Sequence, residues 1–400
     1  MQNSKYNNKK SDKKNLSIYV HYPFCLSKCP YCDFNSHVKS DINQQKFLSA
    51  YLSELEYFAA RLKNRQIKTI FFGGGTPSLM PLNLAEKILE KIATLWQINS
   101  AAEITLEANP TSFEAQKFRD FKVIGFNRLS IGVQALNDGD LKFLGREHSA
   151  AEAIATISAA SKIFNNYSFD LIYARPNQQL RDWSAELKTA IKLSPHHLSL
   201  YQLTIEKGTK FYSQYRNGEF AMPNADLAAE FYQLTNKITD DFNLPLYEIS
   251  NYGTPKYQSK HNLVYWQSGD YLGIGAGAHS RIYFDGEKSR SAITLISEPN
   301  LWMEKALTYG AAIQKQIQLT QDELCEELIL MGLRLDCGIK NNIFKKLLGK
   351  NLMEIFDLPK LQFLIDNNYL EINQNHIRIT DRGRLLTDSI IKKLCLIKKL

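Results

Sequence analysis

The chain has 400 residues, with 44% hydrophobic and 11% aromatic residues, so it can bury a sizeable core and is not a disordered protein. No apolar run approaches the ~18 residues that a membrane-spanning helix needs, and we expect a soluble protein. The net charge of +8 lies at the ends, with +4 in residues 1–15 and +4 in residues 391–400. The chain between them is neutral overall, so charge alone gives no support for a nucleic-acid partner.

The amino-terminal segment "MQNSKYNNKKSDKKN" is polar and lacks the apolar stretch of a secretory signal. We interpret residues 1–15 as a disordered basic head, with a tether for an anionic partner as the less favoured reading. The carboxyl-terminal "IIKKLCLIKKL" indicates a terminal helix, and at most a peripheral contact with an anionic membrane. The six cysteines do not resemble a disulfide framework, so a reducing cytoplasm is the expected location.

Strand-like runs alternate with helical patterns through the first half of the chain. The runs cover 16–22, 67–73, 103–109, 128–134, 168–174 and 197–203. Amphipathic stretches cover 43–63, 82–96, 149–163 and 182–193. Most of the strands are apolar on both faces, which is typical of parallel strands covered by helices. Six βα units predict an α/β fold with a partial (βα)6 barrel over residues 16–245. A doubly wound sheet is the alternative, because strand order cannot be read from sequence.

The pattern changes in the second half. A helix is expected over 224–242, followed by irregular Gly- and Tyr-rich chain over 247–284, and we assign 246–314 to a barrel-closing segment. Helical patterns return in 319–334, 341–356 and 358–372, the last with a trailing strand. Residues 376–394 indicate a strand, a turn at Gly383 and a final helix. Residues 315–400 therefore resemble a small α+β winged-helix module, for which covering the barrel mouth or docking a partner is favoured over DNA binding.

The strongest chemical signal is "HYPFCLSKCPYCDFN", directly after the first strand. Its three cysteines, in C-x3-C-x2-C spacing, are Cys25, Cys29 and Cys32. Three thiolates can hold a four-iron cluster at three corners and leave one iron open. Zinc would need a fourth ligand, for which His21, Asp33 and His37 are near in sequence. Iron–sulfur is favoured over zinc, and ligand-free thiols are the third reading.

Other polar or glycine residues follow the predicted strands at the same end. The run "FFGGGTPS" brings Gly74, Gly75 and Thr76 to the end of the second strand, where backbone groups can approach a ligand without a Cβ in the way. The further members of this set are Glu107, Gln134, Arg146 and Asp170. Singly, each is explained by a cap, a surface charge or a satisfied polar group. Together they predict a polar pocket at the carboxyl ends of the strands.

In this order, "CLSKCPYC", "GGGTPS", "EANP" and "SIGVQ" resemble the radical S-adenosylmethionine (SAM) superfamily, and more narrowly its coproporphyrinogen dehydrogenase branch and the related HemW heme chaperones. The resemblance implies a [4Fe-4S] cluster on the three cysteines, with SAM chelating the fourth iron. It also implies SAM contacts at Tyr19, Gly74, Gly75, Thr76, Glu107, Gln134, Arg146 and Asp170. A guanidinium such as that of Arg146 suits the methionyl carboxylate.

Within this branch, three features favour the chaperones. The dehydrogenases follow the pattern C-x3-C-x2-C-x-C, and Phe34 stands at the position of its last cysteine. Only about fifteen polar residues precede the first strand. The segment "KHNLVYW" matches the H-N-x-x-Y-W signature of the chaperones, which implies heme binding near His261. Read without the resemblance, the same segment is a polar turn followed by two core aromatics.

Three hypotheses follow. The first is a cytoplasmic heme chaperone that binds the cluster, SAM and heme and passes heme to acceptor proteins, with membrane respiratory enzymes among the candidates. The second is oxygen-independent decarboxylation of coproporphyrinogen III to protoporphyrinogen IX, driven by reductive SAM cleavage. The third is a zinc-stabilised interaction module. No catalytic residue is assigned, and SAM cleavage is left open.

Overall fold

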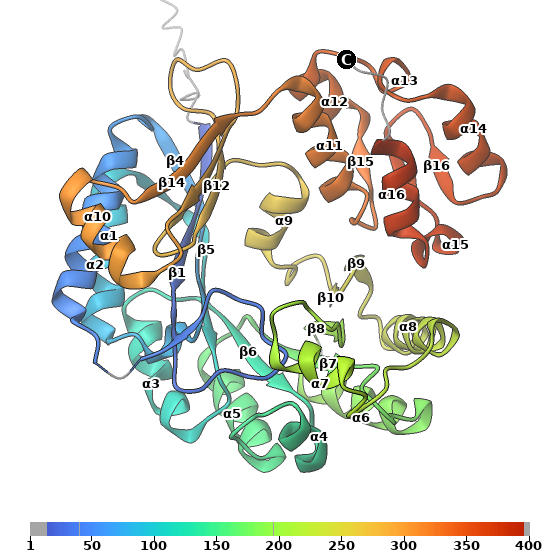
Figure 1. The fold of residues 1–400 in the computed structure, drawn as a ribbon, viewed down its shortest axis with the longest axis horizontal. Helices are drawn as coiled ribbons and strands as arrows, with labels where there is room; N and C mark the ends of the chain where they lie inside the picture. The colour runs from blue at the N-terminus through green and yellow to red at the C-terminus, as the bar shows by residue number, and fades with distance from the viewer. Residues whose placement is uncertain (1–13, 40, 195, 396–400) are drawn as a thin grey trace, which may run out of the picture.

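The computed structural model describes residues 14–39, 41–194 and 196–395. They form a large mixed sheet with helices packed along it and a smaller module at the carboxyl-terminal end of the chain (Figure 1). The predicted head falls largely in residues 1–13, outside the described residues, while β1 begins at Lys14. In the part of the chain that is described, no helix has the length and apolar character to span a bilayer.

Six parallel strands form the centre of the sheet in chain order: β1 (Lys14–Tyr22), β4 (Arg65–Gly74), β5 (Gln97–Ala108), β6 (Arg128–Gln134), β7 (Tyr167–Tyr173) and β8 (His197–Gln202). Because each strand pairs with the next one along the chain, the prediction of a partial (βα)6 barrel is confirmed and the doubly wound alternative is wrong. The carboxyl ends of all six strands therefore meet on one side.

Helices follow these strands. They are α1 (Gln44–Ala59), the short 3-10 helix η1 (Pro77–Leu79), α2 (Leu82–Leu95), α3 (Ser112–Val123), α4 (Asp138–Phe143), α5 (Ala150–Ile163), α6 (Leu180–Leu193), α7 (Lys210–Arg216) and α8 (Ala225–Asp241). Of these, α1, α2, α5, α6 and α8 fall in the ranges expected from sequence. The main core lies between their apolar faces and the sheet, for example where Leu55 of α1 and Ile70 of β4 are fully buried. The burial of such side chains supplies most of the stability of the barrel.

Further strands extend the sheet at both edges. Beside β8 lie β10 (Asn251–Gly253) and β9 (Leu246–Glu248), and beside β1 lie β11 (Tyr271–Ile274), β12 (His279–Ile282), β13 (Ser291–Leu295) and β14 (Ile313–Gln318). The segment 247–284 also contains helix α9 (Lys260–Trp266), so the prediction of irregular chain there is wrong. Elements this short carry too little periodicity to be recognised in sequence.

A buried carboxylate fastens this late segment to the first helix. Glu54 of α1 accepts hydrogen bonds from the backbone N–H of Gly275 (2.8 Å) and of Ala312 (3.2 Å). It also accepts one from the indole of Trp302 (3.2 Å) in α10 (Pro299–Tyr309). Since these partners are more than 200 residues away in sequence, a single side chain links the beginning of the barrel to its end.

The carboxyl-terminal module has its own apolar core. Its helices are α11 (Gln321–Gly332), α12 (Asn341–Leu348), α13 (Leu352–Ile355), α14 (Leu358–Asp366), α15 (Asp381–Arg384) and α16 (Thr387–Cys395). Its antiparallel sheet has the order β15 (Ile339–Lys340), β17 (His376–Ile379), β16 (Leu370–Ile372). The winged-helix-like prediction is confirmed in outline. The turn expected at Gly383 is wrong, because this glycine lies in α15, where a Cβ would come within 2.2 Å of the Tyr369 carbonyl oxygen.

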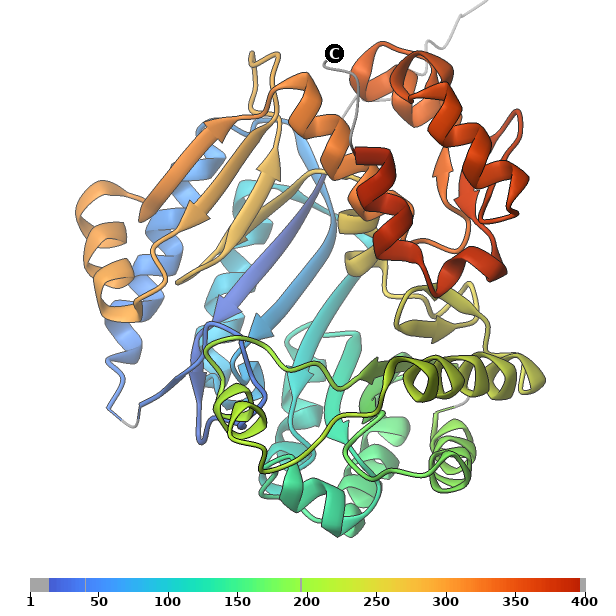
Figure 2. The same cartoon turned by 45° about the vertical axis from the view of Figure 1, so that its right-hand side comes forward.

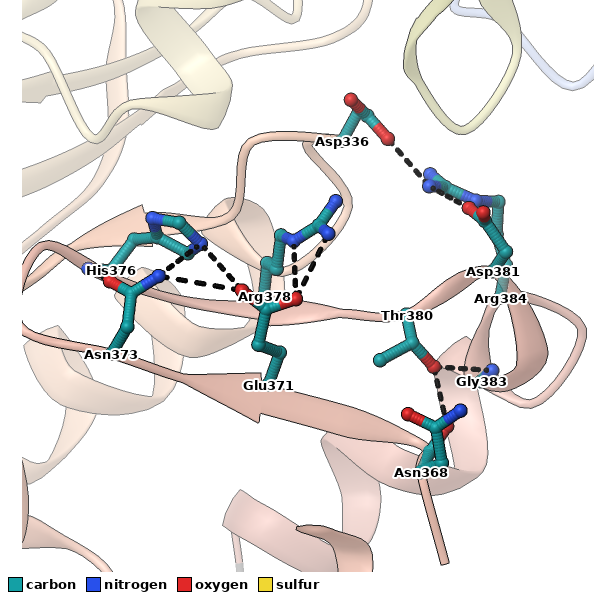
Figure 3. Close-up of polar contacts among 10 residues, drawn as sticks. All are labelled: Asp336, Asn368, Glu371, Asn373, His376, Arg378, Thr380, Asp381, Gly383 and Arg384. Atoms are coloured by element: carbon teal, nitrogen blue, oxygen red, sulfur yellow. Dashed lines mark hydrogen bonds and ion pairs between the residues drawn. The ribbon is translucent and has the colours of Figure 1, made fainter.

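Polar contacts stabilise the small antiparallel sheet of the module (Figure 3) and connect the module to the edge of the barrel. Arg378 of β17 donates to Glu371 of β16 at 2.9 and 3.2 Å. Arg384 donates to Asp336 (2.5 Å) and to Asp381 (3.1 Å). The backbone N–H of Asp336 in turn donates to the carbonyl of Tyr247 in β9, which brings this network to the edge of the barrel.

Candidate functional site

The three clustered cysteines follow β1, with Cys25 in the short strand β2 (Phe24–Cys25) and the other two in the loop after it, and they line one cavity at the carboxyl ends of the strands. The sulfur of Cys25 accepts a hydrogen bond from the hydroxyl of Thr76 at 3.4 Å, and the sulfur of Cys29 accepts one from the guanidinium of Arg146 at 3.4 Å. Cys32 lines the same cavity. The cysteine loop thus contacts two of the residues selected as strand-end candidates.

Close packing from a neighbouring loop holds the cysteine loop. Gly145, with φ +67°, lies so close to Pro30 that a Cβ would come within 2.5 Å of the proline Cδ. The carbonyl of Pro30 accepts a hydrogen bond from the backbone N–H of Phe211 (2.9 Å), and the Tyr31 ring lies 6.2 Å from that of Phe211. Segments far apart in sequence therefore fix where the cysteines point.

The donor set suits a cluster better than a single metal ion. Within the described ranges, no group of three His, Cys, Asp or Glu side chains is placed to hold one ion. His21, a possible zinc ligand, uses its Nδ1 on the Tyr19 hydroxyl (3.0 Å) and its Nε2 on the Asn35 carbonyl oxygen (2.9 Å). A four-iron cluster takes one thiolate per iron, so its three cysteines need not converge on one point. Cys25, Cys29 and Cys32 fit that requirement.

The glycine run joins the strand ends. The N–H of Gly74 donates to the Glu107 carboxylate (3.2 Å), and the N–H of Gly75 donates to the Tyr22 carbonyl (2.8 Å). The N–H of Thr76 donates to the Phe24 carbonyl (2.9 Å), and a Cβ on Gly75 would lie 2.6 Å from that same oxygen. These N–H groups bind protein groups and the glycines permit close strand contact, while Gly74, Gly75 and Thr76 all line the cysteine cavity.

Two carboxyl groups inside the barrel, those of Glu107 and Asp170, line the cysteine cavity. Burial raises the pKa of Glu107 to about 8, and the negative charge of Asp170 adds to this rise. Burial likewise raises the pKa of Asp170 to about 6. Gln134, at the end of β6 with φ +73°, lines the same cavity. This polar, acidic wall favours a ligand that carries positive charge.

Arg146 is one of the cationic side chains that line this cavity, and Asn109 orients it. Its Nη2 donates to the Asn109 side-chain oxygen at 2.7 Å and to the Gly132 carbonyl at 2.8 Å. The Asn109 backbone N–H donates to Glu114 at 2.7 Å. Asn109 and Glu114 were not predicted, although Asn109 stands two residues after Glu107 in "EANP" and the strand-end rule applied to it equally.

Tyr19 and His261 lie outside the cysteine cavity. They line a second cavity of about 300 Å³, deeper in the barrel, which shares Glu107 and Asp170 with the first. Arg128, also missed, is buried there. Its Nη2 donates to the Ser168 hydroxyl (2.8 Å), and its Nε has no partner among the described residues. All the strand-end candidates therefore line the cysteine cavity, whereas Tyr19 and His261 line only the second cavity.

His261 is held on both sides. Its Nδ1 is 2.7 Å from the Thr69 hydroxyl, and its Nε2 is 2.7 Å from the Tyr265 hydroxyl. Its ring stacks on Phe71, with centroids 5.1 Å apart. Burial lowers the pKa of His261 to about 3, so the imidazole is neutral. A metal at either nitrogen would have to displace one of these hydrogen bonds.

Comparisons with known proteins agree with this arrangement. Residues 19–190 match the radical SAM superfamily, and residues 319–386 match the HemN C-terminal domain. The heme chaperone HemW of Escherichia coli is 35% identical, over 94% of this chain and 97% of its own length. The mitochondrial radical S-adenosyl methionine domain-containing protein 1 of Danio rerio is 34% identical, over 95% of this chain and 87% of its own.

A solved structure matches the fold of nearly the whole chain. Coproporphyrinogen III oxidase (HemN) from Escherichia coli superposes with a TM-score of 0.80, over 95% of this chain and 90% of that one. The two sequences are 23% identical. The similarity therefore extends over both the barrel and the carboxyl-terminal module.

Proposed function

Because the chain belongs to the radical SAM superfamily and, within it, to the HemW family, we propose that it is a heme chaperone that binds a [4Fe-4S] cluster, SAM and heme and transfers heme to acceptor proteins. One observation carries the proposal: the three cysteines and the strand-end residues of four strands line a single cavity. A cytoplasmic location and the absence of a nucleic-acid partner belong to the same proposal.

The cysteine cavity is proposed to hold the cluster and SAM. Cys25, Cys29 and Cys32 would hold three irons, and the bound cluster would offer its fourth iron to SAM and supply reducing electrons. Arg146 would bind the SAM carboxylate. The shared acidic wall of Glu107 and Asp170 would compensate the positive charges of SAM. Gly74, Gly75, Thr76 and Gln134 would shape the pocket, with Tyr19 reaching it from the second cavity.

Heme is proposed to bind beside α9, the helix that carries His261. The domain limits expected from sequence, 16–245 for the barrel, 246–314 for the segment with α9 and 315–400 for the module, are kept as part of the proposal. The alternative, oxidative decarboxylation of coproporphyrinogen III, draws support from the fold it shares with HemN. Phe34 argues against this alternative, because it stands, 61% exposed, at the position where the dehydrogenase pattern has an additional cysteine.

The test uses anaerobically reconstituted full-length protein. Wild type should contain about four irons and four sulfides per chain, bind SAM, and take up heme to saturation. The Cys32→Ala variant should lose the cluster and the SAM site, whereas Cys325→Ala, outside the cavity, should keep both. Stoichiometric zinc without sulfide, or turnover of coproporphyrinogen III without heme uptake, would contradict the proposal. Heme titration of His261→Ala tests whether this side chain contributes to the heme site.

A further inference from the structure

A third cavity, of about 630 Å³, lies between the barrel and the carboxyl-terminal module. The barrel contributes the amino ends of β1 and β4 and the end of α9, and the module contributes α11, β15 and α12. Because the cysteine loop follows the carboxyl end of β1, this cavity lies at the opposite end of that strand. In Figures 1 and 2, α9 lies between the sheet and the module.

The walls of this cavity combine an apolar surface with positive charge. Its apolar part comes largely from α11 and α12 and includes Leu328, Ile343 and Leu347. Four lysines line it: Lys14, Lys68, Lys340 and Lys346. None of these lysines forms an ion pair with a carboxylate of the described residues. Its one acidic side chain, Asp270, is 3.7 Å from both Arg65 and Arg290, so its charge is already compensated.

A thiol lines this cavity, and an unpaired indole N–H lies in its wall. The indole N–H of Trp266, at the end of α9, is buried and has no hydrogen-bond acceptor among the described residues. Because this nitrogen has almost no accessible surface, it forms part of the cavity wall rather than facing the space inside. Cys337, in the loop between α11 and β15, is exposed and is the one cysteine of the described chain that lines this cavity.

We propose that heme binds in this cavity, with Cys337 as the ligand of its iron and its propionates directed at the lysines. The inference rests on the proposed chaperone function and names its ligand site. Heme is a planar, mostly apolar molecule with two carboxylates, so it matches a cavity with apolar walls, unpaired cations and a thiol. On ligation the S–H bond breaks, the S–Fe bond forms and the proton passes to solvent.

The second cavity fits heme less well. It is about half as large, and its histidine is hydrogen-bonded at both nitrogens. In the third cavity, the Cys337 thiol would give up only a weak hydrogen bond to the Gly338 carbonyl oxygen (3.7 Å). His261 is then a positioning residue: by binding Thr69 of β4, it orients α9 and therefore Trp266.

The experiment is a titration of ferric heme into the full-length, reconstituted protein, followed by optical and electron paramagnetic resonance spectra. The Cys337→Ala variant should lose the spectrum of thiolate ligation and bind heme about tenfold more weakly or worse, a difference of ~1.4 kcal/mol. The Leu347→Trp variant, which fills the cavity, should weaken binding similarly. Cys395→Ala lies outside the cavity and should behave as wild type. All three variants should retain their cluster and SAM affinity, which shows that they are folded.

The outcomes separate the two proposals. If wild type binds heme but Cys337→Ala and Leu347→Trp leave the spectrum and the affinity unchanged, the cavity is not the heme site, although the chaperone function stands. A loss of heme binding in His261→Ala with both of these variants intact would move the site to the second cavity. If wild type binds no heme, the chaperone function itself fails, and this inference fails with it.

Discussion

A guanidinium N–H of Arg146 donates to the sulfur of Cys29 at 3.4 Å, so the proposed carboxylate-binding residue is also a neighbour of a proposed cluster ligand. The same guanidinium is bonded to Asn109 and to the Gly132 carbonyl. Cluster retention and SAM affinity should therefore depend on one side chain. A hydrogen bond to the sulfur also stabilises the thiolate, which is the form that binds iron.

We expect Arg146→Ala to lower both the retention of the cluster and the affinity for SAM. The substitution leaves the polar groups of Asn109 and Gly132 without a partner, and each such group costs about 1–3 kcal/mol. SAM affinity should fall about tenfold or more, as ~1.4 kcal/mol corresponds to a factor of ten. Isothermal titration and iron analysis measure the two effects. Arg181→Ala, at a side chain that is 87% exposed, is the control. Normal SAM affinity in Arg146→Ala would rule out the assigned role.

Glu107→Gln should flatten the dependence of stability on pH. In the unfolded chain a glutamate titrates near pH ~4, whereas burial raises the pKa of Glu107 to about 8 in the folded protein. Between these values the folded state binds more protons than the unfolded state, so stability falls as pH rises. The variant removes this loss and should be more stable than wild type at pH 8. Thermal unfolding of the SAM-free protein from pH 6 to 9 measures it.

The control for this pH experiment is Glu90→Gln, at an exposed side chain paired with Lys87. It should leave the slope of the melting temperature against pH unchanged. SAM, as a cation, should narrow the difference between wild type and Glu107→Gln at pH 8, because it favours the charged carboxylate. Parallel curves for wild type and Glu107→Gln would show that this carboxyl is not held protonated.

Glu54→Gln should destabilise the barrel without affecting the ligand sites. A carboxamide has one acceptor oxygen, so at least one of the N–H groups of Gly275, Ala312 and Trp302 loses its acceptor. The cost of one buried, unpaired donor is about 1–3 kcal/mol. Denaturant unfolding measures it, with Glu56→Gln, exposed on the same helix, as the matched control. Equal stability of the two variants would contradict the linking role of Glu54.

The two arginines of Figure 3 should differ in importance. The side chain of Arg384 is 9% exposed and bridges Asp336 and Asp381, whereas that of Arg378 is 35% exposed and pairs with Glu371 alone. Arg384→Ala should therefore cost about 1–3 kcal/mol. Arg378→Ala, which removes a surface pair, should cost under ~1 kcal/mol. Chemical denaturation of the full chain compares them, and a larger effect of Arg378→Ala would contradict this order.

The central barrel could be predicted because each of its six strands is a long apolar run with a helix pattern after it. The cysteine cavity could be predicted because polar residues follow those strands at one end, where parallel strands bring them together. This reasoning found Glu107 and Arg146, and it could also have found Asn109. It did not separate Tyr19 from the cysteine cavity, because that depends on how far along its strand a side chain lies.

Elements whose form depends on tertiary contacts were not predictable. Helix α9 has seven residues, and its His261 is fixed by Thr69 and Tyr265 rather than by a periodic pattern. The hydrogen bonds of the glycine run depend on the position of β1 and β5 beside it. The third cavity, between the barrel and the carboxyl-terminal module, is lined by both Lys14 and Cys337, and no local signal connects positions so distant in sequence.

The pairing of β1 with β11 has a consequence for biosynthesis. Ser17 lies opposite Tyr271 and Val20 opposite Ile274, so one edge of the first strand stays unpaired until residues 271–274 have left the ribosome. Such long-range pairing slows folding and leaves apolar strand edges open to aggregation meanwhile. Nascent chains halted before residue 271 should therefore require a folding factor to remain in solution, whereas chains extended beyond β14 can complete the sheet by themselves.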